Sequence, residues 1–353
     1  MHIGLPKEIK DGEFRVALTP EAAGALARAG HVVTVQPGAG DGAGFADAEY
    51  AAAGAQLGDP WKAALVIKVK ELQPAEYGHA RAGQTFFGFH HFGPDRAQLE
   101  AALASRATYV AFETVGEADR SLPILAPMSA IAGRLAVQAG AWFLQKPNGG
   151  SGVLLPGVAD VPGARVLIAG AGNVGSNALE VAAGMGAQVR VFDRSPRRFA
   201  ELQARHPRAR FDSDPALLAD AVAQADLLIG AVLVPGGLAP KVFTRAMLAR
   251  MRRGSVLVDV AIDQGGCAET SRPTRHSAPT YVEEGVVHYC VPNMPSACAR
   301  TASLALSAAA LPWVLELAAG KVSGGLRAAF QVRAGAIVHP QLARDTGRPC
   351  EAL

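Results

Sequence analysis

The stretch "ARVLIAGAGNVGSNALEV", residues 164–181, decides the fold. Its apolar run 166–169 leads directly into Gly170, Gly172 and Gly175, and a helix-forming segment follows. Glycines in this GxGxxG spacing permit a tight turn, let the backbone approach a pyrophosphate and allow close helix packing. The amides at the start of the helix favour phosphate groups. The stretch therefore predicts a Rossmann-type unit that binds a dinucleotide.

An acidic residue completes the pattern after the next strand. Asp193 ends "QVRVFD", about 20 residues beyond the glycines, where a carboxylate can accept hydrogen bonds from both ribose hydroxyls. This position favours NAD. Arg194 and Arg197 follow it and leave NADP as an alternative, although Asp193 would repel a 2′-phosphate.

A second glycine cluster satisfies a looser form of the same pattern. Gly38, Gly40 and Ala43 follow "HVVTVQ" at 31–36, but Pro37 separates the glycines from that segment. The segment is half polar, unlike a central buried strand, and the next strand-like run ends in Lys70 and not in an acid. We therefore interpret this second cluster as a surface loop.

Outward from residues 164–181, strand-like and helix-like segments alternate along most of the chain. This alternation predicts an α/β fold with mainly parallel sheets. Long helices are expected at 129–146 and from about 297, with loop-forming residues after the first. We therefore predict two Rossmann-like lobes: residues 1–128 with 301–353 form a substrate domain, and 129–300 form the cofactor domain.

Composition narrows the class of protein. The 353 residues are 50% hydrophobic and 18% charged, and the formal net charge is +3, so a soluble globular protein is expected. The longest basic block is "RSPRR" at 194–198, which makes nucleic acid an unexpected partner. The chain carries charges from Lys7 onward without an apolar secretory core, which favours the cytoplasm.

Several other sites and activities lack their signature motifs. The apolar window 302–320 contains Ser303, Ser307, Pro312 and Glu316, so a buried helix is favoured over a membrane span. The four cysteines form no CxxC pair, and no metal site is predicted. Neither GxxxxGK[ST] nor GxSxG occurs, which counts against a P-loop nucleotidase and a serine hydrolase.

Residues that could carry chemistry stand near strand ends. Arg15 lies in "GEFRVALTP", and Lys70 ends "LVIKVK". Arginine offers a bidentate fork to a carboxylate, and lysine a compact charge that can polarise a carbonyl. Asp263 follows the strand-like "SVLVDVA", where α/β proteins bind ligands, whereas Asp259 lies within that strand and is expected to make structural hydrogen bonds.

Two adjacent histidines end the aromatic run "TFFGFHHF" at 85–92. If the strand continues through them, alternation places His91 with Phe89 on one face and His90 with Phe92 on the other. Residue composition leaves open which face meets a ligand.

Together these motifs resemble the alanine dehydrogenase family, which also covers the NAD-binding subunit of proton-translocating transhydrogenase and relatives of saccharopine dehydrogenase. The resemblance spans nearly the whole chain. Its segments are "IGLPKEIKDGEFRVALTP" (3–20), "VIKVKEL" (66–72), "LAPMSAIAGRLA" (125–136), "GAGNVGSNA" (170–178), "DLLIGAVLVPG" (226–236), "VLVDVAIDQGGC" (256–267) and "NMPSACARTAS" (293–303).

The resemblance implies two Rossmann-like lobes with an active-site cleft between them, often assembled as hexamers. It implies that Arg15 and Lys70 bind substrate and that His91 and Asp263 are catalytic. It implies oxidative deamination of an L-amino acid by NAD, through an iminium and a carbinolamine. The cofactor contacts that it implies are Ser129, Gly170, Gly172, Asn173, Val174, Gly175, Asp193, Val232, Leu233 and Asn293.

The sequence departs from the family pattern beside the catalytic position. Where relatives that use alanine carry a stretch like "LHLAAD", this chain has "HHFGPD" at 90–95. A remodelled pocket could take another side chain, or a larger amine in place of ammonia, as an opine-type reductase does. A transhydrogenase subunit and a catalytically inactive binding protein remain alternatives from other classes.

Overall fold

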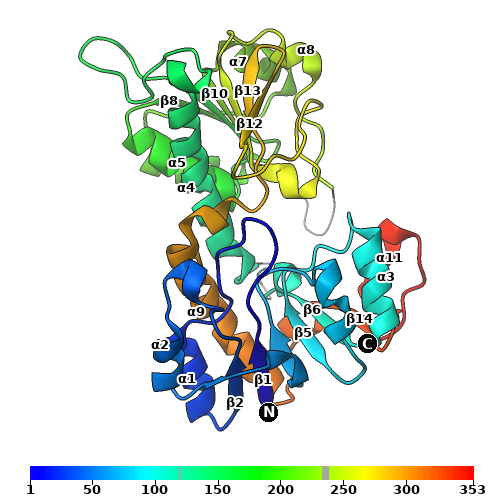
Figure 1. Ribbon diagram of the computed structural model, residues 1–353. Helices are drawn as coiled ribbons and strands as arrows, with labels where there is room; N and C mark the ends of the chain where they lie inside the picture. The colour runs from blue at the N-terminus through cyan, green and yellow to red at the C-terminus, as the bar shows by residue number, and fades with distance from the viewer. Residues whose placement is uncertain (118, 120, 233–237) are drawn as a thin grey trace. The chain divides into compact units, whose positions relative to one another are not determined.

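The computed structural model describes residues 1–117, 119, 121–232 and 238–353. The chain forms two compact units (Figure 1). Among the described residues, unit 1 comprises 1–128 and 296–353, and unit 2 comprises 129–232 and 238–295. Unit 1 therefore resumes at Ser296, five residues before the expected boundary at 301. The serine itself explains the difference, because its hydroxyl is hydrogen-bonded to the N-terminal segment of unit 1.

Unit 1 is built on an eight-stranded sheet of order β15-β14-β6-β5-β4-β1-β2-β3. Strands β3, β2, β1, β4, β5 and β6, in this spatial order, are parallel to one another. Strand β14 pairs antiparallel with β6, and β15 pairs antiparallel with β14. The strand bounds are β1 His2–Leu5, β2 Val32–Val35, β3 Gln56–Leu57, β4 Leu65–Ile67, β5 Thr85–Gly88, β6 Thr108–Ala111, β14 Phe330–Arg333 and β15 Ala336–Ile337. The order 3-2-1-4-5-6 reverses direction between β1 and β4, where α/β sheets bind ligands at their carboxyl edge.

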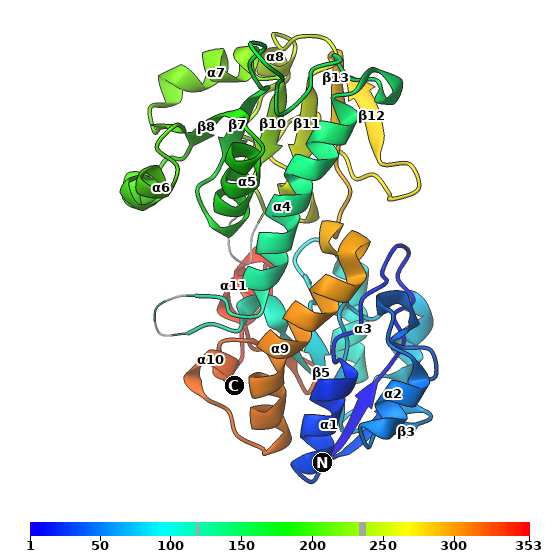
Figure 2. The same ribbon diagram turned by 90° about the vertical axis from the view of Figure 1, so that its left-hand side faces the viewer.

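The helices of unit 1 are α1 Pro20–Arg28, α2 Asp47–Ala52, α3 Arg96–Ser105, α9 Ala299–Ala318, α10 Gly324–Arg327 and α11 Pro340–Thr346. Helix α1 begins at Pro20, because Thr19 accepts a hydrogen bond from the Ala22 amide and Pro20 occupies the first turn. Helix α9 packs beside α1 (Figure 2). The segment Met294–Ala318 is long and apolar enough to cross a membrane, with 39% of its most apolar window buried in the protein.

Unit 2 contains a seven-stranded sheet of order β12-β13-β11-β10-β7-β8-β9. All pairs are parallel except the β12–β13 hairpin. The strands are β7 Arg165–Ala169, β8 Gln188–Phe192, β9 Arg210–Asp212, β10 Leu227–Gly230, β11 Val256–Asp259, β12 Thr280–Glu283 and β13 Val286–Tyr289. The flanking helices are α5 Asn173–Gly184, α6 Phe199–Arg205, α7 Leu218–Gln224 and α8 Arg245–Leu248.

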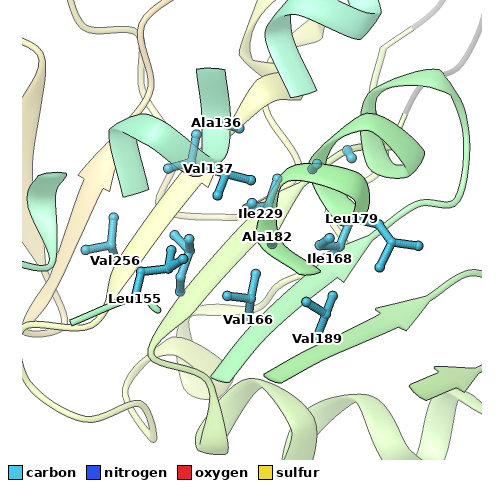
Figure 3. Packing of buried hydrophobic residues seen from close by; sticks show 14 of the residues in the cluster. Ala136, Val137, Leu155, Val166, Ile168, Leu179, Ala182, Val189, Ile229 and Val256 are labelled. Carbon is cyan, nitrogen blue, oxygen red and sulfur yellow. The ribbon is translucent and has the colours of Figure 1, made fainter. Parts of the chain in front are cut away.

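Helix α4 (Leu125–Phe143) begins in unit 1 and covers one face of the unit 2 sheet. Two glycines seven residues apart bring it close: a Cβ at Gly133 would lie 2.2 Å from the Val174 oxygen, and one at Gly140 would lie 2.5 Å from the Leu227 side chain. Figure 3 shows the resulting core, in which Ala136 and Val137 of α4 join residues from α5 and the central strands. The helix begins four residues earlier and ends three earlier than the expected range 129–146.

Two features of unit 1 bear on expectations from the sequence: the end of β5 near the histidines, and the second glycine cluster. The aromatic run does not continue as a strand through the histidines, because β5 ends at Gly88. The amides of His90 and His91 donate to the Glu113 carboxylate and not to a neighbouring strand. The second glycine cluster lies in a loop, as expected, but Gly40 and Ala43 are buried and not at the surface. Gly40 serves packing, because a Cβ there would lie 2.5 Å from the Phe45 oxygen.

Candidate active site

The candidate substrate site lies at the carboxyl edge of the unit 1 sheet. The segments that follow β1, β4, β5 and β6 carry its polar and charged side chains. Because these strands are neighbours and parallel, their carboxyl ends meet at one edge. The residues are Glu8, Glu13 and Arg15 after β1, Lys68 and Lys70 after β4, His91 after β5, and Glu113 after β6.

Arg15 is a buried cation held by its own segment. Its Nε lies 2.8 Å and its Nη2 2.7 Å from the two carboxylate oxygens of Glu13, and Nη1 lies 3.2 Å from the Met128 sulfur. Burial opposes ionisation of Glu13, but the charges of Arg15 and Lys70 and the Arg15 hydrogen bonds outweigh it and lower the Glu13 pKa to about 2. The guanidinium is thereby fixed in one orientation.

Serine hydroxyls hold the backbone around Arg15. The amides of Phe14, Val16 and Thr19 donate to Ser296, Ser303 and Ser307 at 2.9, 2.9 and 3.0 Å. Two of these serines interrupt the apolar window of α9 that the sequence analysis singled out. Their hydroxyls therefore satisfy buried amides of the loop that carries Arg15.

The two lysines after β4 have different surroundings. Lys70 is buried, and its Nζ lies 6.0 Å from the centre of the Phe89 ring. Lys68 lies between Glu8 and Glu76, at 3.1 and 3.0 Å. Burial raises the Glu8 pKa to about 7 although Lys68 opposes that rise. Lys68 was not among the predicted site residues, although Lys68 and Lys70 stand two residues apart in one strand-like run.

The two histidines face different environments. His90 is 2% exposed, stacks on Phe92 with ring centres 5.2 Å apart, and meets Tyr109 edge-on. Its Nε2 lies 3.3 Å from the Phe86 oxygen, and burial lowers its pKa. His91 stacks on Phe89, with ring centres 5.8 Å apart, and its side chain is 31% exposed. The expected pairing of each histidine with a phenylalanine is thus seen beyond the strand end.

Glu113 is a residue that the sequence analysis missed. It follows β6 in the run "TYVAFE", so its position after a strand was the available signal. One carboxylate oxygen accepts from the His91 amide at 2.7 Å and from the His90 amide at 3.2 Å. The same oxygen lies 3.7 Å from His91 Nδ1.

In unit 2, the glycine turn after β7 has the geometry that the motif predicts. A Cβ at Gly175 would lie 1.7 Å from the Gly170 oxygen, and one at Gly170 would lie 2.4 Å from the Ala231 oxygen. A Cβ at Gly172 would meet no atom within 4 Å, and no described side chain caps α5 at this residue. Two glycines therefore serve the fold, and Gly172 leaves space that a pyrophosphate can use.

Asp193 is tied to the same turn. Its Oδ2 accepts from the Ala171 amide at 2.6 Å and its Oδ1 from the Ser195 amide at 2.8 Å. A carboxylate in two such bonds keeps acceptor capacity for ribose hydroxyls. The turn and this acid therefore fit a bound dinucleotide. Asn173 and Val174 are the first two residues of α5.

The two acids near the end of β11 differ in burial and in their hydrogen-bond partners. Asp259 is buried and accepts from the Ala261 and Cys267 amides and from the Ser271 hydroxyl, as its expected structural role requires. Asp263 is exposed and accepts from the Asn293 amide at 3.3 Å.

The remaining predicted cofactor contacts are more scattered. Ser129 lies in α4, half-buried. Val232 follows β10 and is half-buried, whereas Leu233 lies outside the described residues.

Comparisons with known proteins agree with this arrangement. Residues 4–132 match the family described as "Alanine dehydrogenase/PNT, N-terminal domain", and residues 136–341 match its C-terminal domain. The chain is 53% identical to an alanine dehydrogenase of Halomonas elongata, with 90% of this chain and 88% of that protein covered. It is 46% identical to an alanine dehydrogenase of Mycobacterium tuberculosis, with 99% and 98% covered.

Solved structures show the same relationship. A structure titled L-alanine dehydrogenase matches with a TM-score of 0.91 at 46% identity and covers 98% of this chain and 99% of its own. A transhydrogenase from Sinorhizobium meliloti matches with a TM-score of 0.83 at 28% identity, with 96% and 99% covered. The chain belongs to the alanine dehydrogenase/PNT family.

Proposed function

We propose that this protein catalyses the NAD-dependent oxidative deamination of L-alanine, or a closely related small L-amino acid, to the 2-oxo acid and ammonium, and the reverse reductive amination. One observation carries the proposal: a fixed arginine, a buried lysine and a half-exposed histidine follow neighbouring strands at the same sheet edge. Together they suit an anionic substrate that must lose protons as its α-carbon is oxidised.

In this proposal the residues of unit 1 hold and deprotonate the amino acid. The Arg15 guanidinium contributes to binding the carboxylate, and the Lys70 ammonium polarises the oxo group that forms. His91 takes a proton from the water that adds to the iminium and returns a proton when the carbinolamine collapses. Asp263 of unit 2 orients water and ammonia.

The residues of unit 2 bind the cofactor. The turn at Gly172 and the first amides of α5 take the pyrophosphate, and Asp193 takes the ribose hydroxyls. Ser129, Val232, Leu233 and Asn293 complete its contacts. Bound NAD supplies the acceptor for the hydride that leaves the α-carbon. Orientation and acid–base help are then the contributions of the protein itself.

The structure of the "HHFGPD" segment supports alanine over a larger substrate. The two bulky departures from the family pattern, His90 and Phe92, are 2% and 3% exposed and pack against Tyr109. Their volume is therefore taken up by the core of unit 1. An opine-type reductase would need space for a second amine, and these two side chains do not create such space at the site.

We also propose a cytoplasmic homo-oligomer, a hexamer by resemblance to the family. The substrate domain is unit 1 and the cofactor domain unit 2. The 46% identity to alanine dehydrogenases across nearly the whole chain favours this function over that of a transhydrogenase subunit, for which the match is 28% identical.

Variant kinetics test the assignment of His91. NADH absorbance is followed with L-alanine and NAD, and with pyruvate plus ammonium or plus larger amines, for the wild type and for His91→Ala. We expect at least a hundredfold loss of turnover in His91→Ala, with normal activity in the control His31→Ala. Undiminished turnover in His91→Ala would refute the catalytic role, and faster NADH oxidation with larger amines would favour the opine-type reaction.

A further inference from the structure

We infer that Lys241 is a positioning residue that fixes the turn carrying Asp263. The inference rests on the proposed function, because that function makes Asp263 the group that orients water and ammonia. Lys241 touches neither substrate nor cofactor in the proposal. It acts through the backbone of the turn, and both residues belong to unit 2.

The first observation is the conformation of the turn. A short 3₁₀ helix, Val260–Gln264, follows β11 and carries Asp263 near its end. Gly265 and Gly266 come next with φ +90° and +78°, two successive residues in the left-handed region. The last carbonyls of a helix find no partner within the helix itself, and a lysine side chain near its end can satisfy them.

The second observation is that one segment binds three successive carbonyls of this turn. The Ala239 amide donates to the Gln264 carbonyl at 2.9 Å. The Lys241 ammonium donates to the carbonyls of Gly265 at 2.6 Å and Gly266 at 2.9 Å. A single ammonium group thus holds two neighbouring carbonyls, and its positive charge suits the negative ends of their dipoles.

The third observation is the support on the inner side of the turn. The buried Asp259 carboxylate accepts from the Ala261 amide at 3.0 Å and from the Cys267 amide at 2.7 Å. These two amides precede and follow Asp263 in the chain. Asp259 therefore holds the two ends of the turn from within the core, whereas Lys241 holds its carbonyls from the exposed side.

The fourth observation concerns Asp263 itself. Its carboxylate accepts from the Asn293 amide at 3.3 Å, which is longer than the usual range for such a bond. Because Asp263 is exposed, water also competes for this bond. The orientation of the carboxylate is therefore set largely by the backbone of the turn. Loss of the Lys241 ammonium group would let that backbone relax.

The test compares Lys241→Met with the wild type in the reductive direction, using NADH, pyruvate and ammonium. Methionine keeps much of the side-chain length but removes the charge and the hydrogen bonds. We expect KM for ammonium to rise and kcat to fall, each at least fivefold, because a displaced Asp263 orients ammonia poorly. KM for pyruvate and the Kd of NADH should stay within twofold, because Arg15, Lys70 and the glycine turn after β7 are unchanged.

Further variants make the result interpretable. Lys241→Arg keeps a charged donor group and should recover at least half of the lost rate. Lys241→Met combined with Asp263→Asn should be no slower than Asp263→Asn alone, because both changes act on one group. Lys146→Met, at another exposed lysine of unit 2, should leave every constant within twofold. Thermal unfolding of each variant measures whether its fold is retained.

The outcomes separate this inference from the proposed function. An unchanged KM for ammonium in Lys241→Met, or additive losses in the double variant, would overturn the positioning role and leave the proposed reaction intact. Full activity in Asp263→Asn would instead overturn the role of Asp263 in the proposed function. Equal losses of affinity for ammonium, pyruvate and NADH, with a lower Tm in both Lys241 variants, would show a structural role only and would equally overturn the inference.

Discussion

At the scale of single residues, neighbours in the sequence have divided tasks. His90 and His91 are adjacent, yet one ring is buried in the core and the other is half-exposed at the sheet edge. Alternation in the sequence anticipated this division. The sequence could not show that the strand ends at Gly88, because that depends on the Glu113 carboxylate, 22 residues beyond His91.

The glycine turn gives a prediction with a matched control. Gly172→Ala should leave the unfolding temperature within about 1 °C of the wild type, because a Cβ there meets no atom within 4 Å. It should weaken NAD binding about tenfold or more by blocking the approach of the pyrophosphate. Gly175→Ala should cost roughly 3 kcal/mol of unfolding free energy, because its Cβ would lie 1.7 Å from the Gly170 oxygen.

Calorimetry of NAD binding and thermal unfolding of both variants check this difference. Equal losses of stability in the two variants would contradict the distinct roles of Gly172 and Gly175. Unchanged NAD affinity in Gly172→Ala would show that the cofactor does not approach this turn.

At the scale of elements, helix α9 holds the loop after β1 through hydrogen bonds. The hydroxyls of Ser303 and Ser307 accept amides of the loop that carries Arg15. In the sequence these serines stand out only as interruptions of an apolar window. Their role depends on hydrogen bonds to residues nearly 290 positions away in the sequence. Periodicity within a helix cannot reveal such distant contacts.

Removing either serine hydroxyl should make the loop that carries Arg15 less well ordered. We expect Ser303→Ala and Ser307→Ala each to lower the unfolding free energy by about 1–3 kcal/mol, because each leaves a buried amide without its partner. The KM for L-alanine should rise while NAD affinity stays unchanged. Denaturant unfolding and steady-state kinetics test this, with Leu304→Ala on the exposed side of α9 as the control. An unchanged KM in both serine variants would contradict the link to Arg15.

The buried charges after β1 and β4 predict a pH dependence of stability. Burial raises the Glu8 pKa from 4.5 to about 7 in the folded protein, so the folded state binds the extra proton over that interval. Its contribution to stability is therefore full below pH 4.5 and is lost as the pH rises through 7. The pKa values of Glu13 and Glu71 are lowered to about 2 in the folded protein. Their contribution to stability is therefore full above pH 4.5 and is lost as the pH falls toward 2.

Comparison with Glu8→Gln isolates this effect. Between pH 5 and pH 8 the wild type should lose about 2 kcal/mol of unfolding free energy relative to the variant, because glutamine does not titrate. Denaturant unfolding of both proteins at the two pH values measures the difference. A difference that stays constant with pH would contradict a raised Glu8 pKa.

At the scale of the whole molecule, the chain contains two sheets of similar strand order. Each reverses direction next to its first strand, between β1 and β4 in unit 1 and between β7 and β10 in unit 2. The sequence predicted the fold class and the tight glycine turn after β7, since the GxGxxG pattern is a local signal. Neither the strand order nor the charged network around Lys68 could be predicted from it, because both depend on contacts between distant segments.

For the whole chain, the proposed reaction is the oxidation of L-alanine by NAD. The most direct measurement is product analysis after purified protein, NAD and L-alanine are mixed. We predict equal amounts of NADH, pyruvate and ammonium. Absence of NADH with L-alanine and with every other small L-amino acid, in protein that still binds NAD, would contradict the account.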